Sequence, residues 1–159
     1  MTAISDSYTT DIARPAGTLL IAGATATVAF DLFGQALAPA LGFAQLAPVG
    51  LANAVIKTLT GAGWRPGAEM LHYFAGLIAY PLGWFLIVEP ARARVAPWFH
   101  WSLAAVAYGV FLWIFALFGM AHLIAGMKPF LGFTGITWVA LWGHVLFAVV
   151  VATVGWLRR

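Results

Sequence analysis

The hydrophobic positions along the chain form four long apolar stretches, which predict four membrane-spanning helices. These stretches cover residues 17–40, 67–88, 98–124 and 130–157, and each reaches the length of roughly 20 residues that a helix needs to cross a bilayer. Helices satisfy their own backbone hydrogen bonds in lipid, whereas open strands would leave those groups unpaired. We therefore expect a single all-α domain, a four-transmembrane-helix bundle, preceded by a polar N-terminal tail at 1–16.

The connections between these helices differ in length, which bears on how the helices are arranged. Those at 89–97 and 125–129 are short, so helices two and three, and helices three and four, are expected to be antiparallel neighbours. The connection at 42–66 is longer, and Leu51 and Val55 belong to a set of apolar residues at helical spacing within it. This pattern predicts a short amphipathic helix that lies at the membrane interface or folds over the mouth of the bundle.

The composition supports an integral membrane protein and excludes several other classes. Hydrophobic residues make up 63% of the chain and charged residues only 8%, against roughly 25% charged residues in soluble domains. This balance rules out a soluble globular fold and a disordered chain. The sequence contains no cysteine, which excludes disulfides, cysteine-ligated zinc and iron–sulfur clusters. The net charge is +3 without a run of Lys or Arg, so the expected partner is the lipid bilayer and not nucleic acid.

The distribution of basic residues predicts the orientation in the membrane. With four spans, both termini and the second connection share one side, whose basic residues are Arg14, Arg92, Arg94, Arg158 and Arg159. The opposite side has Lys57, Arg65 and Lys128. Cytoplasmic loops carry the excess of Lys and Arg, so we expect the N- and C-termini to be cytoplasmic. The membrane expected for such a chain is the bacterial inner membrane.

Small residues and one proline mark where the predicted helices contact or bend. Glycines allow close approach of two helix backbones in membranes, and the candidates are Gly23, Gly34, Gly76, Gly83 and Gly109. Their contacts would lie within the bundle or at the interface of a homo-oligomer. Pro81 lies inside the second stretch and predicts a kink there.

A charged residue inside the first predicted helix is a functional candidate. Charges within a membrane are costly unless they are paired or hydrated, and Asp31 is such a charge. Thr27, Asp31 and Gln35 follow one another at intervals of four residues, so they form one polar stripe, which should face the bundle interior. Asp31 lies about 20 Å from the inner edge at 1.5 Å per residue.

The same depth arithmetic brings two histidines near Asp31. His144 lies about 20 Å and His72 about 24 Å from the inner edge, with Gln35 and Glu69 one turn further out. Glu69 and His72, three residues apart, share one face of the second helix. This intramembrane polar cluster could be a hydrogen-bonded network that fixes helix packing. It could instead relay protons or ions, because carboxylate–imidazole pairs titrate near neutral pH.

Cofactor binding is a further interpretation of the same residues. Glu69, His72, His144 and Asp31 could hold a metal, since a Glu-x-x-His pair resembles part of the ligand pattern of helical di-iron proteins. His72 and His144 could ligate haem b as a bis-His pair. His122 belongs to one of two Met-x-His pairs, which suit copper, but it could equally hydrogen-bond a loop.

The chain has none of the common catalytic motifs. No Gly-rich phosphate loop, H-E-x-x-H or G-x-S-x-G occurs, so an enzyme is not the expected class. The leading hypothesis is a non-catalytic accessory or structural subunit without a cofactor, packed in the membrane against itself or a larger complex. The alternatives are a proton-, ion- or metal-handling protein that uses the Asp/His cluster, and a bis-His haem-binding protein.

Four segments resemble a group of known proteins. They read GATATVAFDLFG, LHYFAGLIAYPLGW, AYGVFLWIFALFGMAHLIAG and WVALWGHVLFAVVVATV. In this order they resemble small four-helix bacterial inner-membrane proteins of unassigned function, over about 100 residues of the chain. The resemblance points to His72 and His144 as functional positions and implies no particular activity.

Overall fold

Every described element of this chain is a helix. The structure, a computed structural model, describes the backbone of residues 3–158 and the side chains of residues 14–158. Within it, four helical segments are long and apolar enough to cross a membrane. They are Arg14–Ala40, Arg65–Val95, Trp101–Ile124 and Gly135–Leu157, called spans one to four below. The prediction of an all-α chain with four such helices is confirmed.

Most spans join α-helical and π-helical pieces end to end. Span one lies within α1 (Ala3–Leu32), η1 (Phe33–Leu37) and α2 (Ala38–Ala40). Span two consists of α4 (Arg65–Phe74), η2 (Ala75–Ala79), α5 (Tyr80–Gly83), η3 (Trp84–Val88) and α6 (Glu89–Val95). Span three is α7 (Trp101–Ile114) followed by η4 (Phe115–Ile124), and span four is α8 (Gly135–Leu157). Two elements lie between spans: α3 (Pro48–Thr60) and the short 3-10 turn η5 (Pro129–Gly132).

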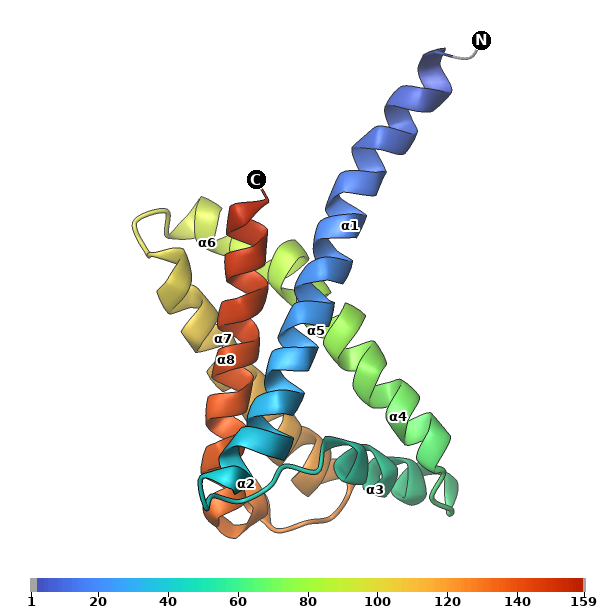
Figure 1. Ribbon diagram of the computed structural model, residues 1–159, viewed down its shortest axis with the longest axis vertical. Coiled ribbons are helices and arrows are strands. Elements are labelled where there is room, and N and C mark those ends of the chain that lie inside the picture. Colours follow the sequence, from blue (N-terminus) through green and yellow to red (C-terminus); the bar gives the residue numbers. More distant parts are fainter. Residues whose placement is uncertain (1–2, 159) are drawn as a thin grey trace.

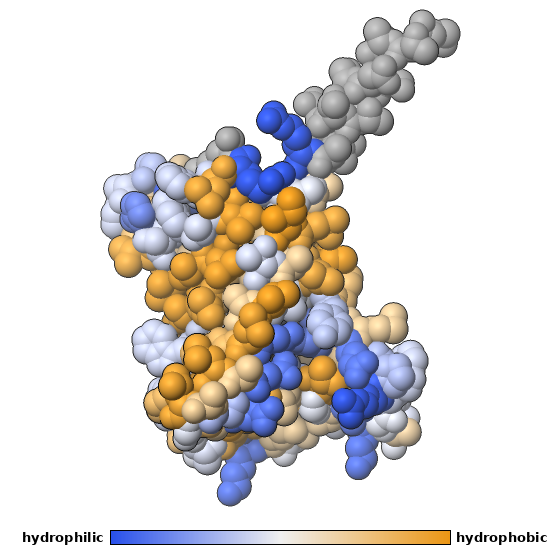
Figure 2. Space-filling model, in the orientation of Figure 1, coloured by the Kyte–Doolittle hydropathy of each residue, from blue (hydrophilic) through white to orange (hydrophobic). Residues whose placement is uncertain are grey.

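The fourth span is the centre of the bundle. α8 packs against α7 on one side and α1 on the other, and α1 also packs against η2. Both termini lie at the same end of the molecule, and α3 crosses the opposite end, where it contacts α4 and η4 (Figure 1). Figure 2 shows hydrophobic side chains over the middle of the visible face and hydrophilic ones toward both ends.

Spans two and three are neighbours at one end only. Near their connection, the Tyr108 hydroxyl donates to the carbonyl oxygen of Tyr80 at 2.7 Å, and Gly83 lies against Tyr108. Toward the other end, α4 slants away from the rest of the bundle (Figure 1), and α3 packs against both spans there. The short connection therefore brings the two helices together at the end where it lies, and it does not hold them in contact along their length.

The ends of the predicted helices need correction. Span four was expected from residue 130, but its helix begins at Gly135, after a turn with left-handed backbone at Phe130, Leu131 and Phe133. The helix of span two continues to Val95, well past residue 88. Because these stretches are apolar or rich in helix formers, hydropathy alone did not separate helix from folded-back turn.

Other ends also differ from the prediction. α1 is helical from Ala3, so the backbone of most of the predicted tail continues the first helix. Residues 1–2 and 159, including Arg159, lie outside the described part of the chain. Span three begins at Trp101, and His100 precedes it as the N-cap, whose imidazole accepts a hydrogen bond from the backbone N–H of Ser102 at 3.3 Å.

Pro81 coincides with an irregular part of span two. Proline has no N–H, so the carbonyl of Leu77 loses the donor that an α-helix would supply four residues later. The π-helical segment η2 ends two residues before Pro81. The Leu77 backbone lies directly against Gly23 of α1, where a Cβ would overlap the carbonyl oxygen. The bare backbone of Gly23 is therefore what allows spans one and two to approach here.

The other candidate glycines also lie at close contacts. A Cβ at Gly109 would come within 2.6 Å of the Val145 Cα, so α7 and α8 approach through their backbones. At the remaining three positions the space is taken by a neighbouring side chain. Gly34 faces Leu46, Gly76 faces Thr27 and Gly83 faces Tyr108. All five glycines thus allow close contacts between segments of the same chain.

Candidate functional site

The structure brings Asp31 and His72 into direct contact between spans one and two. The His72 Nε2 lies 3.1 Å from Oδ1 and 3.2 Å from Oδ2 of the Asp31 carboxylate. The Gln35 amide donates to Oδ1 at 2.8 Å. The two partners are 24% (Asp31) and 12% (His72) exposed. An ionised carboxylate only accepts, so with Asp31 ionised His72 is the donor, through Nε2.

His144 lies nearby but binds its own helix. Its Nδ1 is 2.7 Å from the carbonyl oxygen of Ala140, so Nδ1 carries the hydrogen and Nε2 keeps its lone pair in the neutral ring. The Phe30 ring packs against both imidazoles, with centroid distances of 5.1 Å to His144 and 6.4 Å to His72. The predicted cluster is thus divided into an Asp31–His72 pair and a separate His144.

Glu69 does not join this pair. Its carboxylate accepts a hydrogen bond from Arg65 Nε at 3.1 Å, and it is 47% exposed. The spacing of Glu69 and His72 correctly puts them on one helix but does not turn their side chains to a common point. Arg65, one turn earlier in α4, offers the carboxylate a charged partner near the end of the molecule.

The remaining histidines have local roles. His122 Nδ1 lies 2.8 Å from the carbonyl oxygen of Met127 and so ties the end of η4 to the following turn. His100 caps α7 and its Nδ1 lies 2.8 Å from the Ser102 hydroxyl. Among the described residues, no group of three or more His, Asp or Glu side chains could hold a metal ion.

A large cavity opens beside the two imidazoles. Its volume is about 500 Å³, and His72, His144 and Thr27 are its polar residues besides two tyrosines. Thr27 is 4% exposed, and its hydroxyl oxygen has no hydrogen-bond partner in the described part of the chain. The other lining residues are apolar, and together with Tyr80 and Tyr108 five phenylalanines make the wall rich in aromatic rings: Phe30, Phe74, Phe111, Phe115 and Phe147. No Asp, Glu, Lys or Arg among the described residues lines it.

The cavity has an open side and a closed end. Phe74 of span two and Phe111 and Phe115 of span three line it and are 55%, 58% and 43% exposed, so the opening lies where these two spans diverge. Leu51 and Val55 of α3 close the cavity toward the end opposite the termini. Part of the apolar face predicted for α3 therefore packs against the bundle, whereas Leu59 at its end is exposed.

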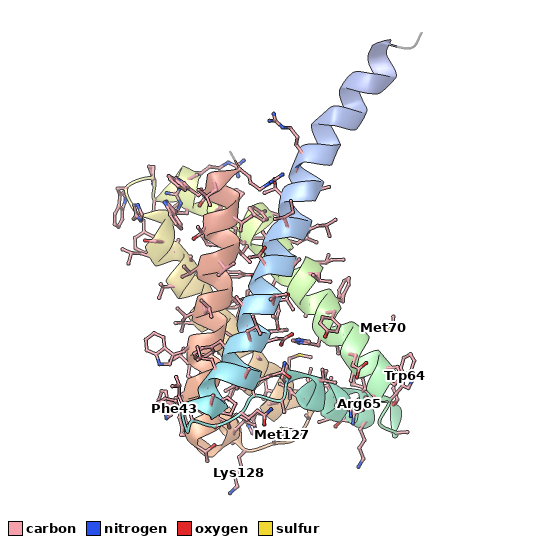
Figure 3. The ribbon with its side chains drawn as sticks, viewed as in Figure 1. Phe43, Trp64, Arg65, Met70, Met127 and Lys128 are labelled. Atoms are coloured by element: carbon pink, nitrogen blue, oxygen red, sulfur yellow. The ribbon has the colours of Figure 1, made fainter. Side chains whose placement is uncertain are left out.

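A second, more polar pocket adjoins the Asp31–His72 pair. It has a volume of about 490 Å³ and is lined by Gln35, Gln45, Asn53 and Arg65 together with apolar residues of 46–50. Gln35 links it to the pair, since the amide that binds Asp31 belongs to a residue of this pocket. Arg65 and Lys128 both lie at the end of the molecule opposite the termini (Figure 3).

The aromatic lining of the cavity is the part of the site that sequence reasoning missed. Phe30, Phe111 and Phe147 occur in uniformly apolar stretches, where lipid-facing and cavity-facing residues look alike. The sequence placed Thr27 only in a polar stripe. The structure shows in addition that Gly76 packs against Thr27 and that the Thr27 hydroxyl has no hydrogen-bond partner among the described residues.

Comparison of the chain with family models, curated proteins and solved structures gives no match.

Proposed function

We propose that this chain is a non-catalytic integral membrane protein that takes a small apolar molecule from the bilayer into the cavity between its helices. The observation that carries this proposal is the cavity itself, which is apolar, has a few convergent polar groups and opens sideways between two spans. Ligand sites are typically clefts of about 300–1,000 Å³ with this combination of walls and polar groups.

The packing of the other half of the bundle favours binding over conduction across the bilayer. Trp84, Ala105 and Val151 are almost completely buried there, and apart from the indole N–H of Trp84 these side chains are apolar. The Asp31–His72 pair is therefore followed, toward the termini, by a dry core. A proton relay would have no polar continuation through these residues, whereas a bound molecule needs none.

The proposal places four spans in the bacterial inner membrane, with both termini cytoplasmic and α3 at the opposite interface. It is supported by the lengths of the apolar helices and by the grouping of basic residues. Arg92 and Arg94 belong to α6, at the end with the termini, near which Arg14 of α1 and Arg158 also lie in the sequence. Lys57 of α3, Arg65 and Lys128 lie at the other end. The positive-inside rule then assigns the first group to the cytoplasm.

Single cysteines test this orientation cleanly, because the sequence contains none of its own. Lys128 and Arg94 are both exposed. A membrane-impermeant maleimide should label Lys128→Cys in intact spheroplasts and should label Arg94→Cys only after the membrane is permeabilised. Labelling with the reverse pattern would show that the protein is inserted the other way round.

A role as an accessory subunit is the second candidate. Its supporting observation is that span two is the least buried, with 17% of its most apolar window buried inside the chain against 50% for span four. A second copy or a larger complex could cover this face in the membrane. Native mass spectrometry of protein extracted in mild detergent separates the candidates, because it reports partner subunits and bound small molecules together.

Filling the cavity tests the proposed function directly. Ala116 of span three lines the cavity and is buried, whereas Ala107 of the same span is exposed on its outer face. We expect the wild type and Ala107→Phe to retain a small apolar molecule through purification, and Ala116→Phe to lose it. The measurement is native mass spectrometry with chromatography of an organic extract. Equal retention by the two phenylalanine variants, or a wild type that yields no such molecule, would contradict the proposal.

A further inference from the structure

The polar atoms of the cavity specify what kind of molecule it can hold. Among the described residues, no Asp, Glu, Lys or Arg lines the cavity, and the Asp31 carboxylate behind His72 is already bound by His72 and Gln35. A charged head group would therefore find no free counter-charge there. Burying an unpaired charge in an apolar site is strongly unfavourable. The ligand is therefore neutral, and its polar part has to match the uncharged groups that are present.

His144 presents an acceptor to this cavity. Its Nδ1–H is occupied by the Ala140 carbonyl, so the ring is held in one tautomer. The remaining nitrogen, Nε2, lies on the opposite side of the imidazole and has no hydrogen-bond partner among the described residues. His144 is 7% exposed and lines the cavity. A ligand that donates a hydrogen bond satisfies Nε2, whereas a ligand with only carbonyl or ether oxygens does not.

Thr27 lines the same cavity but does not offer its hydroxyl to a ligand. The hydroxyl oxygen is buried without a hydrogen-bond partner in the described part of the chain, and Gly76 packs directly against it. Thr27 is therefore a matched control for His144 in the experiment below.

The walls select a flat ring. Phe30 packs edge-on to His144 with a centroid distance of 5.1 Å, and Tyr80 packs edge-on to Phe147 at 5.8 Å. Aromatic rings prefer such offset or edge-to-face arrangements, so these side chains suit an aromatic ligand. Exposed Phe74 and Phe111 at the opening then leave room for a tail that extends into the lipid.

We infer that the cavity binds a lipid-soluble phenol: an aromatic ring with a free hydroxyl and an apolar tail. The ring hydroxyl donates to His144 Nε2, and the tail leaves between spans two and three. This inference rests on the proposed function and adds the chemical class of the molecule.

Two ligands that differ only in the donor test the inference. 4-Decylphenol has the hydroxyl, and its methyl ether, 4-decylanisole, lacks it. Binding to the purified full chain in lipid nanodiscs is measured by calorimetric titration. For the wild type we expect the phenol to bind at least ten times more tightly than the ether. For His144→Leu the two ligands should bind equally, at the level of the ether on the wild type. Thr27→Val, of nearly the same shape, should leave the tenfold preference for the phenol unchanged, because Gly76 covers the Thr27 hydroxyl.

The outcomes separate this inference from the proposed function. If the wild type binds the phenol and the ether equally, and Ala116→Phe binds neither, the cavity is a ligand site but the phenol class is wrong. If neither ligand binds and Ala116→Phe retains the same co-purified molecules as Ala107→Phe, both proposals fail. A visible absorption band of a bound porphyrin that disappears in His144→Leu would replace the phenol by a metal-containing ring. The comparison of phenol and ether on the wild type decides the matter even if His144→Leu does not fold.

Discussion

Gly23→Ala should destabilise the protein by about 3 kcal/mol, at the upper end of the cost of overpacking a well-packed core. The added methyl would overlap the Leu77 carbonyl and come within 2.8 Å of the Leu77 Cα, and both belong to backbone. A flexible side chain could move aside, but here the whole of span two would have to shift. Reversible unfolding in mixed micelles, followed by helical circular dichroism, measures the change in unfolding free energy.

Gly17→Ala in the same helix is the matched control. Nothing lies within 4 Å of a Cβ at Gly17, so only helix propensity changes, and alanine is favoured there by about 0.5–1 kcal/mol. The two substitutions are chemically identical and should act in opposite directions. Equal effects would mean that spans one and two do not approach through Gly23.

The Asp31–His72 pair should show a coupling energy of about 2 kcal/mol in a double-mutant cycle, the range found for hydrogen bonds to charged groups. The contact is short on both carboxylate oxygens, at 3.1 and 3.2 Å, and largely shielded from solvent. Asp31→Ala and His72→Ala each leave the other group without its partner, so each single change is costly and the double change costs much less than their sum. The same unfolding assay supplies the four free energies.

A second pair, between a basic side chain and a carboxylate within α4, provides the control. Arg65 and Glu69 are 3.1 Å apart but 83% and 47% exposed, and exposed pairs four residues apart contribute about 0.3–0.5 kcal/mol. The cycle on Arg65→Ala and Glu69→Ala should therefore give a coupling several times smaller. A coupling at Asp31–His72 no larger than this one would show that the pair does not hold spans one and two together.

The Asp31–His72 contact could be anticipated because depth in a membrane is readable from sequence. A carboxylate in the middle of an apolar helix needs a partner, and counting residues from the helix ends brought His72 to nearly the same depth. His144 met the same criterion, yet its ring binds Ala140 of its own helix. The depth of a residue says nothing about the rotation of its helix about the helix axis, which decides the direction of the side chain. Here both imidazoles pack against the Phe30 ring, but only His72 contacts Asp31.

Glu69 and the start of span four illustrate a second limit. The Glu-x-x-His spacing is compatible with a shared site, but the competing partner, Arg65, lies one turn away and takes the carboxylate. Likewise, Phe130 and Leu131 are as apolar as the helix that follows, yet they form a turn. In this turn the carbonyl oxygen of Phe130 accepts a hydrogen bond from the Thr137 hydroxyl at 2.5 Å. In both cases a local hydrogen bond outweighs what the periodic pattern indicates.

The sequence by itself determined that this chain has four long apolar helices and an additional amphipathic one, since hydrophobicity and helical spacing are properties of each segment alone. It also located the polar residues that had to find partners. Only the tertiary structure decided which partners they found, how far span two leans from span three, and that a cavity with His144 and Thr27 in its wall results. These features depend on the rotation and tilt of helices, which are set by contacts such as Gly23 with Leu77 between residues far apart in the chain.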